Sequence, residues 1–231
     1  MIKDMKPNVK FIIAGDFNQL PPVNDRIGEN FNYKNSQALK ELCDFNKLEL
    51  SKCRRSDDKL FEMCKFENIM NIEKSEFNND FTNRHLAYTH KKRIEINDKC
   101  MEKRLKKSHN KALILDANIY DPHSQKVYLD TKTPIICKIN DKEMELVNNE
   151  QFIITKYDTD IIYIKNAEKQ MKIPISKFQK LFYVAYCITI HKSQGATFDF
   201  PYTIHEFYKL DKKLRYVALT RSTDIKYINI I

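Results

Sequence analysis

Three short segments combine polar side chains with glycine or arginine in patterns that suit phosphate chemistry. The first, residues 15–23, reads GDFNQLPPV and directly follows an apolar run. The amide of Gln19 both donates and accepts hydrogen bonds, so it could sense a terminal phosphate or orient an attacking water. Pro21 and Pro22 would stiffen the connection after it, because the proline ring fixes φ. The alternative interpretation is an ordinary strand-to-turn transition with its Asp and Asn as turn formers.

The second segment, residues 186–198, reads YCITIHKSQGATF. It places hydroxyl groups, a lysine and backbone N–H groups after a predicted strand, which suits contact with a phosphate backbone without base readout. In the alternative interpretation His191 is a hydrogen-bonded core histidine and Lys192 is ordinary surface. The length of the uninterrupted pattern favours phosphate contact.

The third segment, residues 216–222, reads YVALTRS. Its Arg221 carries a permanent charge on a planar fork that matches phosphate oxygens, so it could neutralise charge on a transferring phosphoryl group. The alternative is a solvated helical arginine with no such role.

The elements that must position these segments follow an α/β pattern. Residues 9–14 predict a buried strand that carries the first segment at its carboxyl end. Residues 34–70 predict two helices around an arginine-bearing stretch. A short strand at 85–89 and a charged helix at 91–107 then open a second α/β domain. The basic side chains of that helix are interleaved with acidic ones, so a nucleic-acid track and a solvated helix face both remain open.

The carboxyl-terminal half predicts a β-rich insertion inside the α/β pattern. Short β-rich runs spaced by about ten residues predict a small antiparallel barrel, at 134–139, 152–154, 161–164 and 171–173. The α/β pattern then resumes with a strand at 182–190, a turn at 191–197, a helix at 214–219 and a strand at 226–231.

Composition limits the class of protein. The 231 residues carry a formal net charge of +9, which suits a polyanionic partner. The six cysteines never form C-x-x-C, so we predict no zinc or other metal site and reduced thiols. The charged start excludes a signal peptide, and no run approaches the roughly 20 apolar residues of a membrane helix. We expect an intracellular protein of the cytoplasm, the nucleus or a viral replication compartment, not secreted and without a membrane partner.

Glycine is scarce, with only 3 residues, where average usage of about 7% would give roughly 16. The lysine-, asparagine- and isoleucine-rich composition is typical of an AT-rich genome, such as that of a large DNA virus. We expect the remaining glycines to occupy backbone positions that other residues cannot adopt.

The three segments resemble motifs III, V and VI of superfamily 1B helicases of the RecD-like and Pif type. Residues 48–57 (LELSKCRRSD) are similar to a further arginine segment of that family, although Cys53 and Arg55 depart from its usual aromatic and glutamine. The resemblance covers nearly the whole chain and preserves the motif order. It implies an α/β fold, in which 1–80 ends a first RecA-like domain and 81–231 form a second RecA-like, P-loop NTPase-type domain with an SH3-like insertion at about 130–180.

The resemblance also implies residue roles. Catalytic roles fall to Gln19, Arg221 and Arg54, although Arg55 or a plain surface salt bridge is an alternative for the last of these. The residues near the nucleotide would be Gly15, Asp16, Gln19, Arg54, Gln194, Gly195 and Arg221. The residues on the nucleic acid would be Pro21, Pro22, Thr89, Thr189, His191, Lys192, Ser193 and Thr197. The family's members use ATP and Mg²⁺ and move 5′-to-3′ on single-stranded DNA.

The chain contains no G-x-x-x-x-G-K followed by Ser or Thr, and no Asp-Glu pair for Mg²⁺. We therefore expect it to bind nucleic acid weakly and to hydrolyse no ATP until an amino-terminal RecA-like half is supplied in cis or in trans. A non-catalytic nucleic-acid-binding remnant, a subunit of a split helicase and an RNA helicase of the same superfamily are the alternatives.

Overall fold

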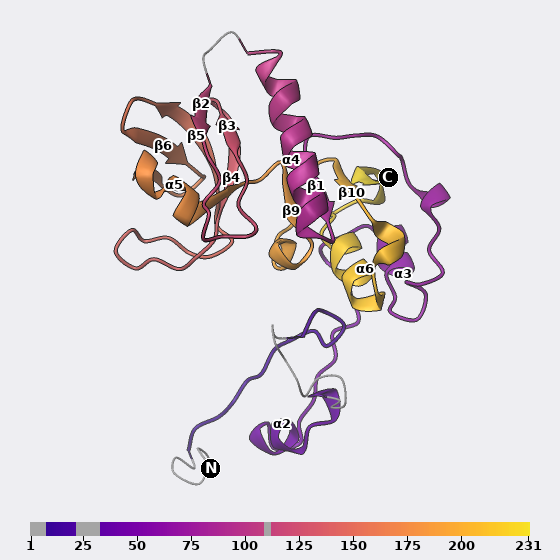
Figure 1. Ribbon diagram of the computed structural model, residues 1–231. Helices are drawn as coiled ribbons and strands as arrows, with labels where there is room; N and C mark the ends of the chain where they lie inside the picture. The colour runs from indigo at the N-terminus through magenta and orange to yellow at the C-terminus, as the bar shows by residue number, and fades with distance from the viewer. Residues whose placement is uncertain (1–7, 22–32, 109–111) are drawn as a thin grey trace.

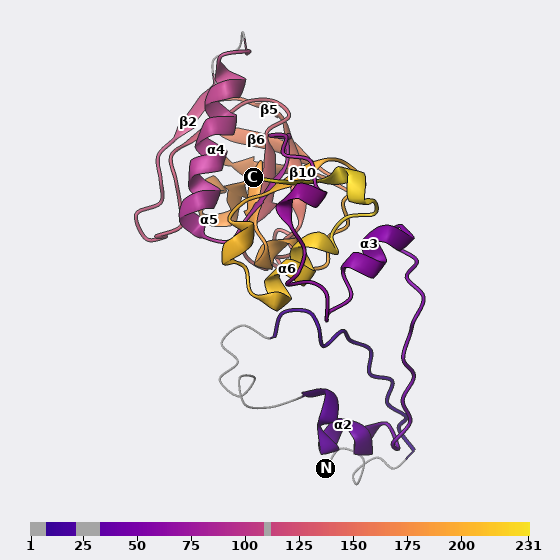
Figure 2. The same cartoon turned by 90° about the vertical axis from the view of Figure 1, so that its right-hand side faces the viewer.

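The computed structural model describes residues 8–21, 33–108 and 112–231. Figures 1 and 2 show an extended amino-terminal segment, a parallel sheet flanked by helices, and a separate antiparallel sheet packed beside it. Within the amino-terminal segment the regular elements are η1 (Tyr33–Asn35) and α2 (Gln37–Leu42). The predicted α/β character is confirmed.

The parallel sheet has the strand order β11-β10-β1-β9. Its strands are β1 (His85–Ala87), β9 (Cys187–Thr189), β10 (Tyr202–Ile204) and β11 (Ile228–Ile230). Every neighbouring pair is parallel. All positions of the strands are buried, as expected where helices cover both faces of a parallel sheet.

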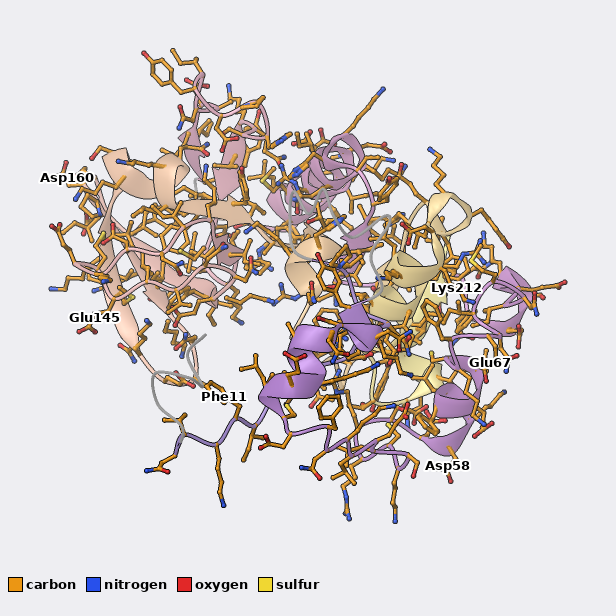
Figure 3. All side chains as sticks on the ribbon, turned by 90° about the horizontal axis from the view of Figure 1, so that it is seen from below. Phe11, Asp58, Glu67, Glu145, Asp160 and Lys212 are labelled. Atoms are coloured by element: carbon orange, nitrogen blue, oxygen red, sulfur yellow. The ribbon has the colours of Figure 1, made fainter. Side chains whose placement is uncertain are left out.

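The helices lie on both faces of the parallel sheet, and the side chains of β1 show which helix covers which face. Leu86 belongs to the core that contains α3 (Asp58–Met63) and α6 (Lys212–Leu219), whereas Ala87 packs with Ile96 of α4 (His90–Leu105). Successive side chains of a strand point to opposite faces, so α4 covers one face and α3 with α6 the other. Figure 3 shows Asp58 and Lys212 on one side of the molecule, with Glu145 and Asp160 marking the antiparallel part on the other.

The antiparallel sheet has the order β7-β6-β5-β4-β8. Its strands are β4 (Pro134–Cys137), β5 (Gln151–Tyr157), β6 (Ile161–Lys165), β7 (Gln170–Pro174) and β8 (Phe182–Val184). A hairpin of β2 (Leu113–Leu115) and β3 (Val127–Leu129) and the helix α5 (Ile175–Leu181) complete this part. Phe152, Phe178 and Phe182 lie in its core, which Met101 of α4 also enters.

The single strand predicted at 182–190 is wrong. β8 pairs with β4 in the antiparallel sheet, and β9 pairs with β1 in the parallel sheet. Between them, the amide of Asn97 donates to the carbonyls of Val184 and Cys187 at 3.2 and 3.0 Å and accepts from the Cys187 N–H at 2.8 Å. The run 182–190 is largely apolar because β8 and β9 are both buried. Where the chain passes from one sheet to the other, the buried amide of Asn97 satisfies backbone groups that would otherwise lack hydrogen-bond partners.

The buried strand predicted at 9–14 is also wrong in this structure. The segment is extended but joins no ladder among the described residues, and Ile12 is 97% exposed. A strand is buried only where neighbouring strands and a covering layer exist, and the described part of the chain provides neither here. The two helices predicted within 34–70 are confirmed as α2 and α3.

The other predicted elements of the carboxyl-terminal half are confirmed within a few residues at their ends. The strands β2, β3 and β10 were not predicted. The remaining turns are η2 (Lys74–Glu76), η3 (His191–Ser193), η4 (Phe207–Lys209) and η5 (Ile225–Tyr227). Among the helices that the structure describes, none is long and apolar enough to cross a lipid bilayer.

Candidate nucleotide and nucleic-acid site

The carboxylate of Asp16 joins the first segment to the body of the molecule. Its Oδ1 accepts from the Asn18 N–H at 2.9 Å, and its Oδ2 accepts from the Gln19 amide at 3.1 Å and from the Tyr216 hydroxyl at 3.0 Å. Gln194 then donates to Oε1 of Gln19 at 3.3 Å. Three segments that are far apart in the sequence therefore meet at one polar cluster, which we call the Asp16 cluster: Asp16, Asn18, Gln19, Gln194 and Tyr216.

The two described glycines, Gly15 and Gly195, differ in backbone conformation. Gly195 adopts φ +88°, a conformation that L side chains rarely adopt, so the expectation of a special backbone position is confirmed there. A Cβ on Gly15 would meet nothing within 4 Å and its φ is not positive, so the same expectation is wrong for Gly15. Pro21 follows Leu20, which packs against the main core, and Pro22 lies outside the described residues.

Arg221 is almost completely buried, with 1% of its surface exposed. Its guanidinium donates to the carbonyls of Val217 at 2.9 Å and Ala196 at 3.1 Å and to the Thr220 hydroxyl at 3.1 Å. Burial, and next the charge of Arg55, lower the pKa of Arg221. In this conformation Arg221 connects the second and third segments, and a phosphate would reach it only after rearrangement.

The neighbouring arginines are accessible. Arg55 is exposed and donates to the carbonyl of Thr220 at 3.2 Å, whereas Arg54 is exposed and has no hydrogen bond to the described part of the chain. Asp57 fixes this stretch, because its Oδ1 accepts from the Leu60 N–H at 2.9 Å and its Oδ2 from the Ile225 N–H at 3.0 Å. The side chain of Arg55 therefore lies beside the third segment, whereas that of Arg54 is exposed to solvent.

The second segment divides into inward and outward side chains. Ser193 is fully buried and donates to the carbonyl of Ile190 at 2.7 Å, and Thr189 is buried as the strand end. His191 and Thr197 are exposed. In this conformation the two outward residues can meet a strand directly, whereas the inward ones hold the shape of the turn.

Lys192 is tied to the antiparallel sheet. Its ammonium donates to Oδ1 of Asn148 at 3.1 Å and of Asn149 at 2.8 Å, and burial lowers its pKa. Asn149 has φ +71°, a left-handed conformation that asparagine tolerates better than most residues. The sequence alone did not indicate this pair as partners of Lys192, since more than 40 positions separate them.

The donors of Thr89 are engaged within the protein. Its backbone N–H and its hydroxyl both donate to one carboxylate oxygen, Oε2 of Glu206, at 3.0 Å each. Burial opposes ionisation of Glu206, but the hydrogen bonds from Thr89 and Lys209 outweigh it and lower the Glu206 pKa. A backbone phosphate at Thr89 would have to displace this carboxylate, which the sequence did not indicate.

The basic helix α4 is not a uniform cationic track. Glu95 pairs with both Lys92 at 3.1 Å and Lys99 at 2.7 Å. Arg93 is buried, and Arg104 donates to the carbonyl of Thr131. The carboxylate of Glu95 thus offsets part of the positive charge on the exposed face. Across the described ranges, no group of three or more His, Cys, Asp or Glu side chains could hold a metal ion.

Comparison with known proteins gives structural but not sequence relatives. No protein-family model matches the sequence, and no curated protein matches it. The chain is similar in structure to Pif1 helicases unwinding forked double-stranded DNA, with a TM-score of 0.68 and 20% identity, over 94% of this chain and 59% of that one. It is also similar to Bacteroides Pif1 in complex with ADP-AlF3 and ssDNA, with a TM-score of 0.60, 20% identity and coverage of 94% and 60%.

A third similar structure is the Pif1 helicase from Candida albicans, with a TM-score of 0.61, 15% identity and coverage of 94% of this chain and 63% of that one. The chain thus spans about three fifths of the length of these helicases. At this level of identity the likeness shows the fold. The fold is a RecA-like one, and the parallel sheet is consistent with a P-loop NTPase-type domain.

The Asp16 cluster makes a testable prediction about the first segment. Asp16→Ala removes the acceptor of the Asn18 N–H and the bond to Tyr216, each worth about 1 kcal/mol. Amide hydrogen exchange at residues 16–20 should become about 5-fold faster or more, while exchange within β1 and β9 stays unchanged. Asp199→Ala, which removes another exposed carboxylate, is the control. Unchanged exchange at 16–20 in Asp16→Ala would mean that the cluster does not hold the segment.

Proposed function

We propose that this chain supplies the second motor domain, and the end of the first, of an ATP-dependent helicase that moves on single-stranded DNA. The observation that carries the proposal is the Asp16 cluster, in which Gln19 lies against Gln194 and Asp16 lies against Tyr216. A motor must couple nucleotide state to polymer grip, and this cluster connects the segment assigned to nucleotide sensing with the two assigned to grip and charge neutralisation. A domain division near residue 80 belongs to the same proposal.

The nucleotide would lie beside the Asp16 cluster. Gln19 presents an amide that can contact a terminal phosphate or a water, and the exposed guanidinium of Arg54 can approach the same phosphate oxygens. These side chains fit the γ-phosphate end of ATP. We propose that the remaining phosphates and Mg²⁺ are held by an amino-terminal RecA-like half, because the 231 residues contain no phosphate-cradling glycine-lysine loop. ATP hydrolysis would supply the free energy for movement.

The nucleic acid would lie across the second segment. His191 and Thr197 are exposed there, and Lys192 stands between them and the antiparallel sheet. The side chains are hydroxyl, imidazole and ammonium groups, which suit backbone phosphates better than base edges. Backbone contact of this kind tolerates RNA as well as DNA, and an RNA helicase is the nearest alternative. The Pif1 structure with ADP-AlF3 and ssDNA is one support for the DNA assignment. An intracellular setting is part of the proposal.

The test is ssDNA-stimulated ATP hydrolysis by this chain alone and by the chain joined to the polypeptide encoded immediately upstream. We expect hydrolysis only in the joined protein. There, Gln19→Ala and Arg54→Ala should each lower kcat by about 10²- to 10³-fold, as for loss of one preorganised transition-state contact. Lys52→Ala, on the same exposed stretch, should leave kcat unchanged and is the matched control.

The outcomes separate the alternatives. Hydrolysis by the chain alone would contradict the proposed division of labour. No hydrolysis by the joined protein, with ssDNA binding intact, would favour a non-catalytic binding module. Equal or stronger stimulation by poly-U than by poly-dT would favour an RNA helicase.

A further inference from the structure

The loop between β2 and β3, residues 116–126, carries two large hydrophobic side chains at its tip, and both face solvent. Ile119 is 86% exposed and Tyr120 is 89% exposed. Apolar surface left in water forgoes the stabilisation of burial, so a rigid backbone is needed to keep such a pair from folding back on the surface. Figures 1 and 2 both show this loop close to the amino-terminal end of α4.

The backbone of the loop is fixed by its own side chains. The Tyr120 N–H donates to Oδ1 of Asn118 at 3.0 Å, and the Asp121 N–H donates to the Asn118 carbonyl at 3.0 Å. The His123 N–H donates to Oδ1 of Asp121 at 2.9 Å. Two side-chain-capped turns in succession therefore set the position of Ile119 and Tyr120.

The base of the loop is anchored to the rest of the fold. Asp121 accepts from the ammonium of Lys138 and, at 2.8 Å, from the hydroxyl of Tyr183. The guanidinium of Arg93 donates to the His123 carbonyl. Gln179 donates to the Asp116 and Gln125 carbonyls at 2.9 and 3.1 Å, at the two ends of the loop. The tip is thus presented on a rigid support.

Two cations with little exposure to solvent hold the anchor: Arg93 is buried, and Lys138 is paired with Asp121. Arg93 and Lys138 both lie over the ring of Tyr183, at 4.6 and 4.3 Å from its centre. The rings of His90 and His123 are stacked, with centres 3.7 Å apart. Burial, followed by the charges of His123 and Arg93, lowers the pKa of His90 to about 4. Ala87 of β1 pairs with Thr189 of β9, so His90 and Lys192 follow neighbouring parallel strands at the same edge of the sheet.

The combination is that of a single-strand binding surface. The side chains of His191 and Lys192 suit backbone phosphates, and the exposed ring of Tyr120 offers a face on which a base can stack whatever its identity. We propose that Tyr120, supported by Ile119, forms a base-stacking platform for the strand held at His191 and Lys192. The proposal rests on the proposed function, since it assumes a strand at the second segment. It adds a contact to the bases, where the second segment offers contacts to the backbone.

The test is the affinity of the 231-residue chain for a fluorescein-labelled oligo-dT strand, followed by fluorescence anisotropy. Tyr120→Ala should weaken binding by about 5- to 100-fold, as base stacking is worth about 1–3 kcal/mol. Tyr120→Phe should bind as the wild type does. Phe45→Ala, which removes an aromatic side chain 66% exposed on the amino-terminal segment, should have no effect.

A second oligonucleotide of the same length that lacks bases separates the contribution of base stacking to the affinity from that of charge. On this abasic strand, Tyr120→Ala and the wild type should bind equally, whereas Lys192→Ala should bind both strands more weakly. If Lys192→Ala weakens binding but Tyr120→Ala does not, the platform is overturned while the proposed function stands. If the wild type binds neither strand, both are overturned. A Tyr120→Ala penalty that persists on the abasic strand would also overturn the platform.

Discussion

Replacing Arg221 with alanine is expected to lower the free energy of unfolding by about 3 to 5 kcal/mol. The substitution leaves the carbonyls of Val217 and Ala196 and the Thr220 hydroxyl without their donor, inside a region where Arg221 is only 1% exposed. It also removes the volume of one of the largest fully buried side chains. Urea unfolding followed by circular dichroism measures the effect.

The matched control is Arg54→Ala, because Arg54 is exposed and makes no hydrogen bond to the described residues. Its free energy of unfolding should stay within about 0.5 kcal/mol of the wild type. An Arg221→Ala protein as stable as the wild type would contradict the buried network. The comparison matters for function, since loss of ATP hydrolysis in an Arg221 variant indicates a phosphate contact only where the fold is retained. Arg221→Lys keeps the charge and is the variant for that purpose.

Acidification from pH 7 to pH 5 is expected to destabilise the fold through two buried histidines. His85 and His205 lie on β1 and directly after β10, with Nδ1 of His85 3.2 Å from Nε2 of His205. Burial, followed by the charge of its partner, lowers the pKa of His85 to about 3, and burial followed by Lys92 lowers that of His205 to about 4. Both rings are therefore neutral in the folded protein at pH 5.

The direction of the change in stability with pH follows from proton binding. In the unfolded chain a histidine has a pKa of about 6.5 and binds a proton as the pH falls, while the folded protein excludes it. The stabilisation is complete above about pH 6.5 and is lost as the pH falls toward about 3 to 4, at about 2 kcal/mol for one histidine by pH 5. With both rings neutral in the folded protein at pH 5, the two contributions add to about 4 kcal/mol. His90, with its lowered pKa, changes stability in the same direction.

Urea unfolding at a series of pH values measures this loss. The double variant His85→Gln/His205→Gln removes both titrating rings, so its stability should vary much less between pH 7 and pH 5. His191→Gln, which removes an exposed histidine, should keep the wild-type pH dependence. An equally steep dependence in the double variant would show that other groups cause the acid sensitivity.

The sequence was sufficient to predict helices and strands that depend on interactions between residues close together in the chain. The helix at 91–107 was predicted from its pattern, and α4 spans His90–Leu105 with Thr89 as its N-cap. The antiparallel strands were predicted from short β-rich runs spaced by about ten residues, and these runs appear as β4 to β7. The prediction at 182–190 failed because a run buried in two different sheets has the same composition as one long buried strand.

The site residues likewise include some that were predicted from the sequence and partners that were not. The sequence placed Asp16, Gln19 and Gln194 among candidates near a nucleotide, and the structure brings them together. It gave no signal that Tyr216 would donate to Asp16, that Glu206 would occupy the donors of Thr89, or that Asn149 would bind Lys192. Each of these partners is more than 40 positions away, and a pairwise contact at such a separation leaves no periodicity in one sequence.

The sequence by itself determined the chemistry that is available: an amide at position 19, guanidiniums at 54 and 221, and hydroxyl, imidazole and ammonium groups at 189–193, in an α/β order. Only the tertiary structure decided which of these groups reach solvent. Arg221 and Ser193 are turned inward, while Arg54, His191 and the pair Ile119–Tyr120 face outward. The physical reason is that a buried polar group must find its partners within the fold, and those partners are fixed only when distant segments pack.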